Sequence, residues 1–147
     1  MIRAIDTNIL VYLAASDVPQ HAKSRRAIEE FLSRSRENRI AVSDDVLFEF
    51  VHVVTDPKRL KSPLTMVAAL DWAEALWSGR ETQPLLPSPE TFTRTMALLR
   101  KHGLSRKRIR DTALAAVLEE NGVREIWTAN AGDFQVFPFL KAIDPTS

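Results

Sequence analysis

Residues 2–11 read Ile-Arg-Ala-Ile-Asp-Thr-Asn-Ile-Leu-Val, and this stretch decides the fold class. A short apolar strand, Ile2 to Ile5, runs directly into Asp6-Thr7-Asn8 and then into a second apolar run. An acid at the carboxyl end of a first strand stands where open α/β sheets bind their ligands. We therefore expect a ligand site beside Asp6, although an Asp in this place can also simply cap the next helix.

The rest of the chain alternates short apolar strands with helical patterns. The expected strands are 40–43, 83–86, 125–128 and 140–143, and the expected helices are 21–36, 46–55, 62–77, 89–102 and one that Ser105 caps and that runs to 121–122. This alternation predicts an α/β fold with a mostly parallel sheet, covered by helices on both faces and joined by right-handed crossovers.

The composition is that of an ordinary folded protein. With 147 residues, 45% of them apolar and 27% charged, residues 1–147 fit one domain. The absence of cysteine excludes disulfides and thiolate chemistry, and three scattered histidines argue against structural zinc. We find no basic-then-apolar leader and no apolar stretch near the ~20 residues of a membrane span, so we expect a cytoplasmic protein with no membrane partner.

Isolated acids recur at places comparable to that of Asp6. Glu49 interrupts the apolar helix 46–51, Asp111 shares a helical face with apolar residues, and Asp133 follows the strand 125–128. Carboxylates that converge at one edge of a sheet form a hard-oxygen site suited to Mg²⁺ or Mn²⁺. Two alternatives to a metal remain. An ion pair with an arginine would also compensate the charge of Glu49. Arg110 is a candidate partner for Asp111, although the side chains of adjacent helical residues point in different directions and pair poorly.

A metal would explain why these acids tolerate one another. Clustered carboxylates raise each other's pKa values, and a divalent cation removes that conflict while it activates water and stabilises charge on a phosphoryl oxygen. Such chemistry needs no nucleophilic side chain, and the chain has neither a Gly-x-Ser-x-Gly elbow nor a Gly-rich phosphate loop.

The segment 94–110 has seven Lys/Arg and no acid. It is a candidate surface for a polyanion or else a solvated helix face.

Four motifs together resemble those of the PIN-domain ribonucleases, and in particular the VapC-like toxins of toxin–antitoxin modules. They are Ile5-Asp6-Thr7-Asn8-Ile9-Leu10, Val46-Leu47-Phe48-Glu49-Phe50-Val51, Arg110-Asp111-Thr112-Ala113-Leu114-Ala115-Ala116 and Thr128-Ala129-Asn130-Ala131-Gly132-Asp133-Phe134. The resemblance implies a three-layer α/β/α sandwich with a central sheet of about five strands. It also implies Mg²⁺- or Mn²⁺-dependent RNA cleavage, a homodimer and a small cognate antitoxin as partner.

The resemblance assigns the first three acids of the family to Asp6, Glu49 and Asp111. At the fourth acidic position this chain has Asn130, and the nearest carboxylate is Asp133. We take Asp6, Glu49, Asp111 and Asp133 as the catalytic and metal-binding residues, Asp133 acting directly or through water. Asn8 and Asn130 are supporting oxygen donors.

Two other functions compete with a metal-dependent endoribonuclease toxin. An aspartyl phosphotransferase of the haloacid dehalogenase type also begins with an acid after its first strand, but it needs a second Asp where this chain has Asn8. A catalytically weakened PIN-like module for RNA binding or scaffolding is the non-enzymatic alternative. Carboxylates at Asp6, Glu49 and Asp111 argue against that module, because a binding surface gains nothing from repelling phosphates.

Overall fold

The computed structural model describes all 147 residues and has a five-stranded parallel sheet at its centre. Its strands lie in the order β3-β2-β1-β4-β5, and every neighbouring pair is parallel. Ala4 of the central strand pairs with Ala41 on one side and Ile126 on the other. The strands are β1 (Ile2–Ile5), β2 (Arg39–Ser43), β3 (Thr82–Leu85), β4 (Glu125–Trp127) and β5 (Lys141–Ile143).

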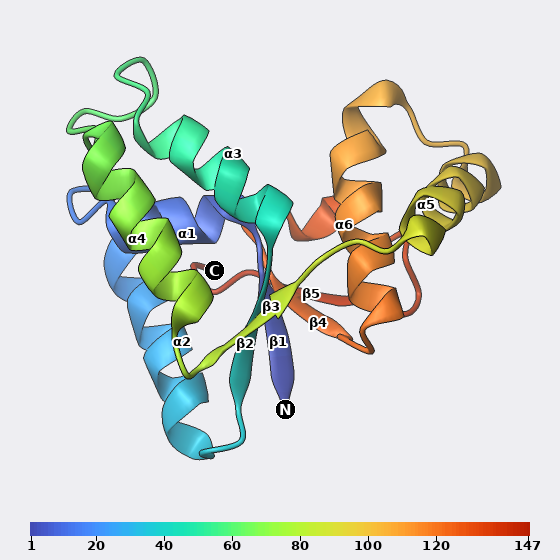
Figure 1. Cartoon of the computed structure of the whole chain (residues 1–147), viewed down its shortest axis with the longest axis horizontal. Coiled ribbons are helices and arrows are strands. Elements are labelled where there is room, and N and C mark those ends of the chain that lie inside the picture. The colour runs from blue at the N-terminus through green and yellow to red at the C-terminus, as the bar shows by residue number, and fades with distance from the viewer.

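Helices cover both faces of the sheet, so the predicted three-layer α/β/α sandwich is confirmed. Figure 1 shows α1 to α4 on one side of the sheet and α5 with α6 on the other. No helix is both long and apolar enough to span a membrane. The helices are α1 (Thr7–Ala14), α2 (His21–Arg34), α3 (Asp44–Val54), α4 (Met66–Ser78), α5 (Pro89–His102) and α6 (Ile109–Glu120), with 3-10 turns η1 (Arg106–Arg108) and η2 (Ala131–Asp133).

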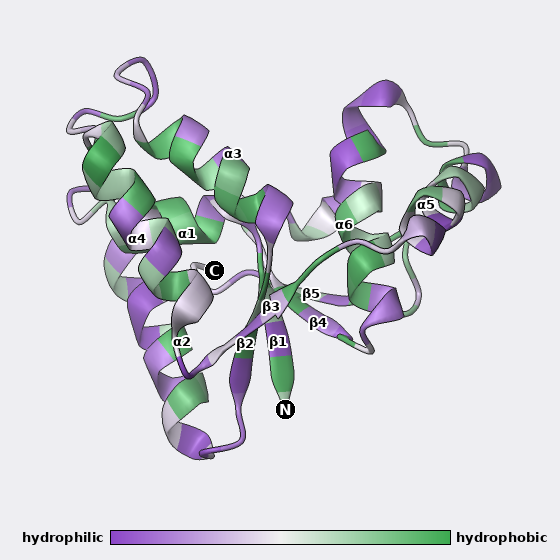
Figure 2. Cartoon of the chain, in the orientation of Figure 1, coloured by the Kyte–Doolittle hydropathy of each residue, from purple (hydrophilic) through white to green (hydrophobic).

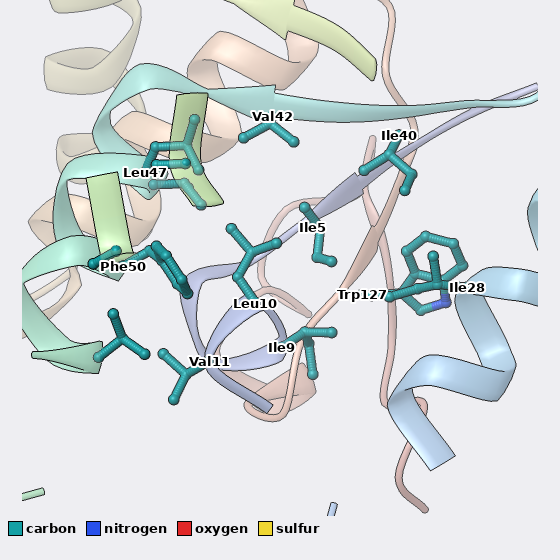
Figure 3. Close-up of a cluster of buried hydrophobic side chains, with 14 of the residues drawn as sticks. Ile5, Ile9, Leu10, Val11, Ile28, Ile40, Val42, Leu47, Phe50 and Trp127 are labelled. Atoms are coloured by element: carbon teal, nitrogen blue, oxygen red, sulfur yellow. The ribbon is translucent and has the colours of Figure 1, made fainter. Parts of the chain in front are cut away.

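The core is divided by the sheet because successive residues of a strand point to opposite faces. Ile5 belongs to the cluster under α1 to α4, whereas its neighbour Ala4 belongs to the cluster under α5 and α6. Figure 3 shows the first cluster, in which side chains of α1 and α3 meet those of the strands. In Figure 2 hydrophobic colour dominates α1 and α3, while α2 alternates between hydrophilic and hydrophobic residues.

Helix α1 was not predicted as a helix from the sequence. Asp6 is its N-cap and accepts a hydrogen bond from the Thr7 backbone N–H, and Ile9 and Leu10 are fully buried. This burial stabilises a helix of only eight residues whose β-branched residues have weak helical propensity.

Two other predicted helix starts were also wrong. Helix α4 begins at Met66 rather than Ser62, because Thr65 is the N-cap and Leu64 donates its backbone N–H to Val54 O. Ser105 makes no side-chain cap hydrogen bond, and the chain forms the 3-10 turn η1 before α6. The remaining strands and helices lie within a few residues of their predicted bounds.

Helix α3 offers a matched test of the core. Phe50 is fully buried and stacks on Trp72 at a ring distance of 4.6 Å, whereas Phe48 on the same helix is 69% exposed. Phe50→Ala should lower the free energy of unfolding by about 3–5 kcal/mol through loss of burial and cavity formation. Phe48→Ala should change it by about 0.5 kcal/mol or less. Urea denaturation followed by far-UV circular dichroism measures both, and equal losses would contradict this orientation of α3.

Candidate functional site

A pocket of about 410 Å³ opens beside the carboxyl ends of β1 and β2. In Figure 1 this edge of the sheet lies where α1, α3 and α6 approach one another. Parallel strands place the segments that follow them at the same edge, which is how distant acids come together here. The pocket is lined by Asp6, Thr7, Asn8, Val11, Tyr12, Val18, Glu49, Val53, Arg59, Leu60, Asp111 and Asn130.

Asp6 is held in place through both of its carboxylate oxygens. Its Oδ1 accepts the Thr7 backbone N–H at 2.8 Å, and its Oδ2 accepts the Thr128 hydroxyl at 2.8 Å. Burial raises the pKa of Asp6 above its usual value, the two hydrogen bonds oppose that rise, and the charges of Glu49 and Asp133 add to it. The carboxylate is therefore held in a fixed position, and burial and neighbouring acids destabilise its charged form.

Glu49 lies on the exposed edge of α3 rather than in an apolar environment. Its side chain is 45% exposed, although the sequence around it is apolar. Its Oε2 accepts the Thr7 hydroxyl at 3.2 Å and lies 4.0 Å from Arg110 Nη2. Arg110 makes its closer contact with Asp45, at 2.8 Å, so Glu49 has only a weak ion pair.

Asp111 lies in the first turn of α6 and carries the clearest electrostatic signature of the site. Burial raises its pKa to about 6, and the nearby charges of Asp6 and Asp133 contribute to the rise. The guanidinium of Arg108 lowers the pKa of Asp111, and Glu49 raises it slightly. Arg110, which the sequence analysis considered as an alternative partner but expected to pair poorly with Asp111, contacts Asp45 instead.

The segment after β4 contributes Asn130 to the pocket and contains the carboxylate of Asp133. Asn130 lines the pocket and donates its backbone N–H to Thr128 Oγ1 at 3.1 Å, while Asn8 Oδ1 accepts the Ala129 N–H at 3.1 Å. Asp133 is not a lining residue. It lies in η2, 46% exposed, with its Oδ1 3.8 Å from Arg108 Nη1.

Three supporting residues were missed by the sequence analysis. The hydroxyls of Thr7 and Thr128 hold Asp6 and Glu49, and Arg108 donates through Nη2 to the backbone carbonyl of Asp133. Both threonines belong to the motifs quoted above, so their position beside the acids was a usable signal. The contact of Arg108 with η2 gave no such signal, because it joins segments 25 residues apart.

The oxygen donors that line the pocket suit a hard divalent cation, although the carboxylates are not close enough together to form a complete metal site. No group of three or more His, Cys, Asp or Glu side chains is arranged to hold a metal ion. The pocket nevertheless gathers carboxylate and amide oxygens, the ligands that Mg²⁺ and Mn²⁺ prefer. Burial raises the pKa values of Asp6 and Asp111 and neighbouring carboxylates raise them further, so a cation bound in the pocket would stabilise the charged forms of both.

Comparison with known proteins agrees with this architecture. The model of the PIN domain matches residues 4–140. The chain belongs to the PIN-domain family. Ribonuclease VapC24 of Mycobacterium tuberculosis, in strains CDC 1551 and H37Rv, is 29% identical to this PIN domain over 142 residues, which are 97% of this chain and 95% of the relative.

Solved structures share the same fold. The structure of Mycobacterium tuberculosis VapC20, described as a Sarcin-Ricin loop cleaving toxin, superposes with a TM-score of 0.70 at 18% identity, over 96% of this chain and 98% of that one. A chain of VapBC2 from Rickettsia felis, solved with a DNA fragment from the promoter, gives 0.70 at 21% identity and covers 98% of both chains. At such identities the likeness concerns the fold of this PIN domain.

The charge at Asp111 should make the metal-free protein less stable as the pH rises. The folded-state pKa of about 6 lies above the ordinary 3.8, so the stability present below about pH 4 is lost as pH rises through 6. Asp111→Asn removes this dependence and should stabilise the protein by about 1 kcal/mol at pH 8 and little at pH 4, after solvent screening.

Urea denaturation in EDTA from pH 4 to pH 8 measures this difference. Asp71→Asn, which changes an exposed acid on α4, is the matched control and should follow the parent curve. A stability gain for Asp111→Asn that is the same at all pH values would contradict an electrostatic origin.

Proposed function

We propose that this protein is a divalent-metal-dependent endoribonuclease and the toxin of a toxin–antitoxin module. The observation that carries the proposal is the pocket itself, in which Asp6, Glu49 and Asp111 meet at the carboxyl edge of a PIN-domain sheet. The relative with 29% identity, which spans almost the whole chain, is a ribonuclease. Phosphodiester hydrolysis is the reaction for which such a pocket is suited.

Asp6, Glu49, Asp111 and Asp133 would hold Mg²⁺ or Mn²⁺, with Asn8 and Asn130 as supporting oxygen donors. The burial of Asp6 and Asp111 and the repulsion from nearby carboxylates, which raise the pKa values of both, support this assignment. When bound, the cation would supply positive charge to the scissile phosphate and ease deprotonation of the attacking water.

The residues of the chain orient this chemistry. Thr7 and Thr128 fix the carboxylate of Asp6, so little reorganisation is needed when substrate binds. Glu49 uses Oε2 for the Thr7 hydroxyl, and its other oxygen makes no hydrogen bond and is free to accept one from water. Arg108 holds η2, and with it Asp133, against the start of α6.

Only part of the basic segment 94–110 is available for RNA phosphates. Arg94 makes a two-pronged contact with Glu119, at 2.6 and 3.0 Å, and is therefore engaged within the protein. Arg106 and Lys107 form no ion pair and lie in η1, directly before the helix that carries Asp111. Phosphates held at η1 would lie next to the acidic pocket.

A small cognate antitoxin is the proposed protein partner, and the active form is proposed to be a cytoplasmic homodimer. The structural neighbours include VapBC-1 from nontypeable Haemophilus influenzae and a toxin-antitoxin complex from Klebsiella pneumoniae. An antitoxin segment with an Arg or Lys would pair with Asp6 or Glu49 where the cation would bind. Its apolar part would dock against Val11, Tyr12 and Leu13 of α1.

A non-catalytic PIN-like module for RNA binding or scaffolding is the second candidate. Two observations favour it. Asp133 faces Arg108 and does not line the pocket. The carboxylates are also not arranged as a complete metal site. The cleavage assay separates the two functions.

The purified protein should cleave RNA only when Mg²⁺ or Mn²⁺ is present. Asp6→Asn keeps the shape and the helix cap but removes the charge, so cleavage should fall by about a hundredfold or more while the protein stays folded. The rate is measured on ribosomal and transfer RNA with and without EDTA. Cleavage by Asp6→Asn at the parent rate would rule out a catalytic role for this carboxylate.

The same assay ranks the candidates for the fourth position. Asp133→Ala should cost more activity at low Mg²⁺ than Asn130→Ala, because a carboxylate contributes charge as well as an oxygen, and excess Mg²⁺ should partly restore it. The opposite ranking would assign the fourth ligand to Asn130.

Production of this protein alone should arrest growth of the host cell, and Asp6→Asn should relieve the arrest. Coexpression with an adjacent small reading frame should restore growth and yield a stable complex on copurification. Leu13→Ala, which alters the proposed docking surface but not the acidic residues, should weaken that complex without changing cleavage by the isolated protein. Normal growth with intact active protein would count against the toxin role and leave the nuclease role standing.

A further inference from the structure

The pocket has an acidic half and an apolar half, arranged along two helices. On α1 the polar Asn8 is followed one turn later by Val11 and Tyr12, and on α3 Glu49 is followed one turn later by Val53. Residues three or four apart share a helical face, and one turn is about 5.4 Å. The apolar half therefore begins about one turn away from the carboxylates.

Tyr12 is the distinctive residue of the apolar half. It is the only tyrosine of the chain, its half-buried ring packs against the core cluster beneath α1, and its hydroxyl makes no hydrogen bond within the protein. A tyrosine ring in a pocket wall offers an apolar surface together with a polar tip that normally finds a partner. Here that partner would come from a ligand.

Arg59 stands at the edge of the same half with its guanidinium largely free. Its side chain is 63% exposed, and its only carboxylate contact is with Asp56 at 4.0 Å. Lys58 and Lys61 flank it in the α3–α4 connection. A second basic segment, η1, lies next to Asp111 at the start of α6. Positive charge therefore stands near both halves of the pocket.

We propose that the apolar half is a nucleobase subsite for the nucleotide next to the scissile phosphate. The base would stack against Tyr12, and Arg59 would contact the base edge or the adjoining phosphate. This inference rests on the proposed RNA cleavage and names the residues that would select the RNA sequence. Single-stranded RNA is commonly recognised by unstacked bases placed on aromatic and guanidinium planes.

A base fits this half better than a phosphate does. The carboxylates of Asp6, Glu49 and Asp111 repel phosphate at one end, and most of the wall, formed by Val11, Val53 and Leu60, is apolar. A base presents flat apolar faces together with a polar edge that matches a free hydroxyl and a guanidinium. The whole pocket, with its acidic and apolar halves together, has a volume of about 410 Å³, within the range of roughly 300–1,000 Å³ typical of small-ligand sites. An antitoxin side chain docked on Tyr12 would compete with the base.

The path of the RNA follows from the same geometry. Helix α3 begins beside α6, where Asp45 meets Arg110, and ends at Val54 close to the basic connection. Its eleven residues span about 16 Å. A strand held at η1 and at Lys58 to Lys61 would therefore run along α3, with the carboxylates and Tyr12 beneath it.

The single tyrosine gives a direct readout of binding without metal. Protein labelled with 3-fluorotyrosine has one ¹⁹F resonance, which is followed in EDTA during titration with AMP, CMP, GMP, UMP and, as the base-free control, ribose 5-phosphate. At least one nucleotide should shift the signal saturably, and ribose 5-phosphate should not. Equal shifts with ribose 5-phosphate, or no shift up to about 10 mM nucleotide, would overturn the subsite, since millimolar affinity is weak even for one stacked base.

Kinetics with a short RNA substrate provides the second test. Tyr12→Ala should raise KM about tenfold and change kcat less than about twofold, because stacking contributes binding. Tyr12→Phe keeps the ring and should recover most of the affinity. Phe92→Ala, which removes a 69% exposed aromatic on α5 across the sheet, should leave both constants unchanged. Thermal melts confirm that each variant is folded.

The outcomes separate this inference from the proposed function. RNA cleavage by the parent with an unchanged KM for Tyr12→Ala would overturn the subsite and leave the nuclease standing. No cleavage by the parent would overturn the nuclease, and the base-dependent ¹⁹F shift would still decide whether the apolar half binds nucleobases.

Discussion

Three hydrogen bonds at Asp6 join the central strand to its neighbour and to the first helix. Its backbone N–H donates to Trp127 O at 2.9 Å, its Oδ2 accepts from Thr128, and its Oδ1 accepts from Thr7. The same carboxylate caps α1, links β1 to the end of β4 and lines the pocket. Because a carboxylate has about four acceptor positions, these structural bonds leave capacity for a ligand. One residue therefore contributes both to the fold and to the pocket.

Local chemistry accounts for the elements that were predicted well. Helix α5 begins at Ser88-Pro89 with a capping box and ends at Gly103, whose φ of 57° is in the left-handed region that glycine tolerates. Helix α1 is different, because its β-branched residues favour a strand by local propensity. Burial in the core stabilises the helix instead. The errors fall where tertiary packing overrides local preference.

The convergence of acids at one edge of the sheet was predictable, and the partners of each acid were not. Parallel topology brings Asp6, Glu49 and Asp111 to one pocket. Whether Asp133 faces the pocket or Arg108 depends on the fold of η2, and the exposure of Glu49 depends on the rotation of α3. Neither is encoded in sequence spacing, because both depend on contacts between segments far apart in the chain.

The long sequence separation at the site has a consequence for biosynthesis. Asp6 and Thr128, which share a hydrogen bond, are 122 residues apart. During translation β1 leaves the ribosome early, but its neighbour β4 and the segment after it emerge only near the end of synthesis. A nascent chain therefore carries its first acid for most of its synthesis without the strand that orients it. The pocket beside Asp6 is therefore completed only when the chain is nearly finished.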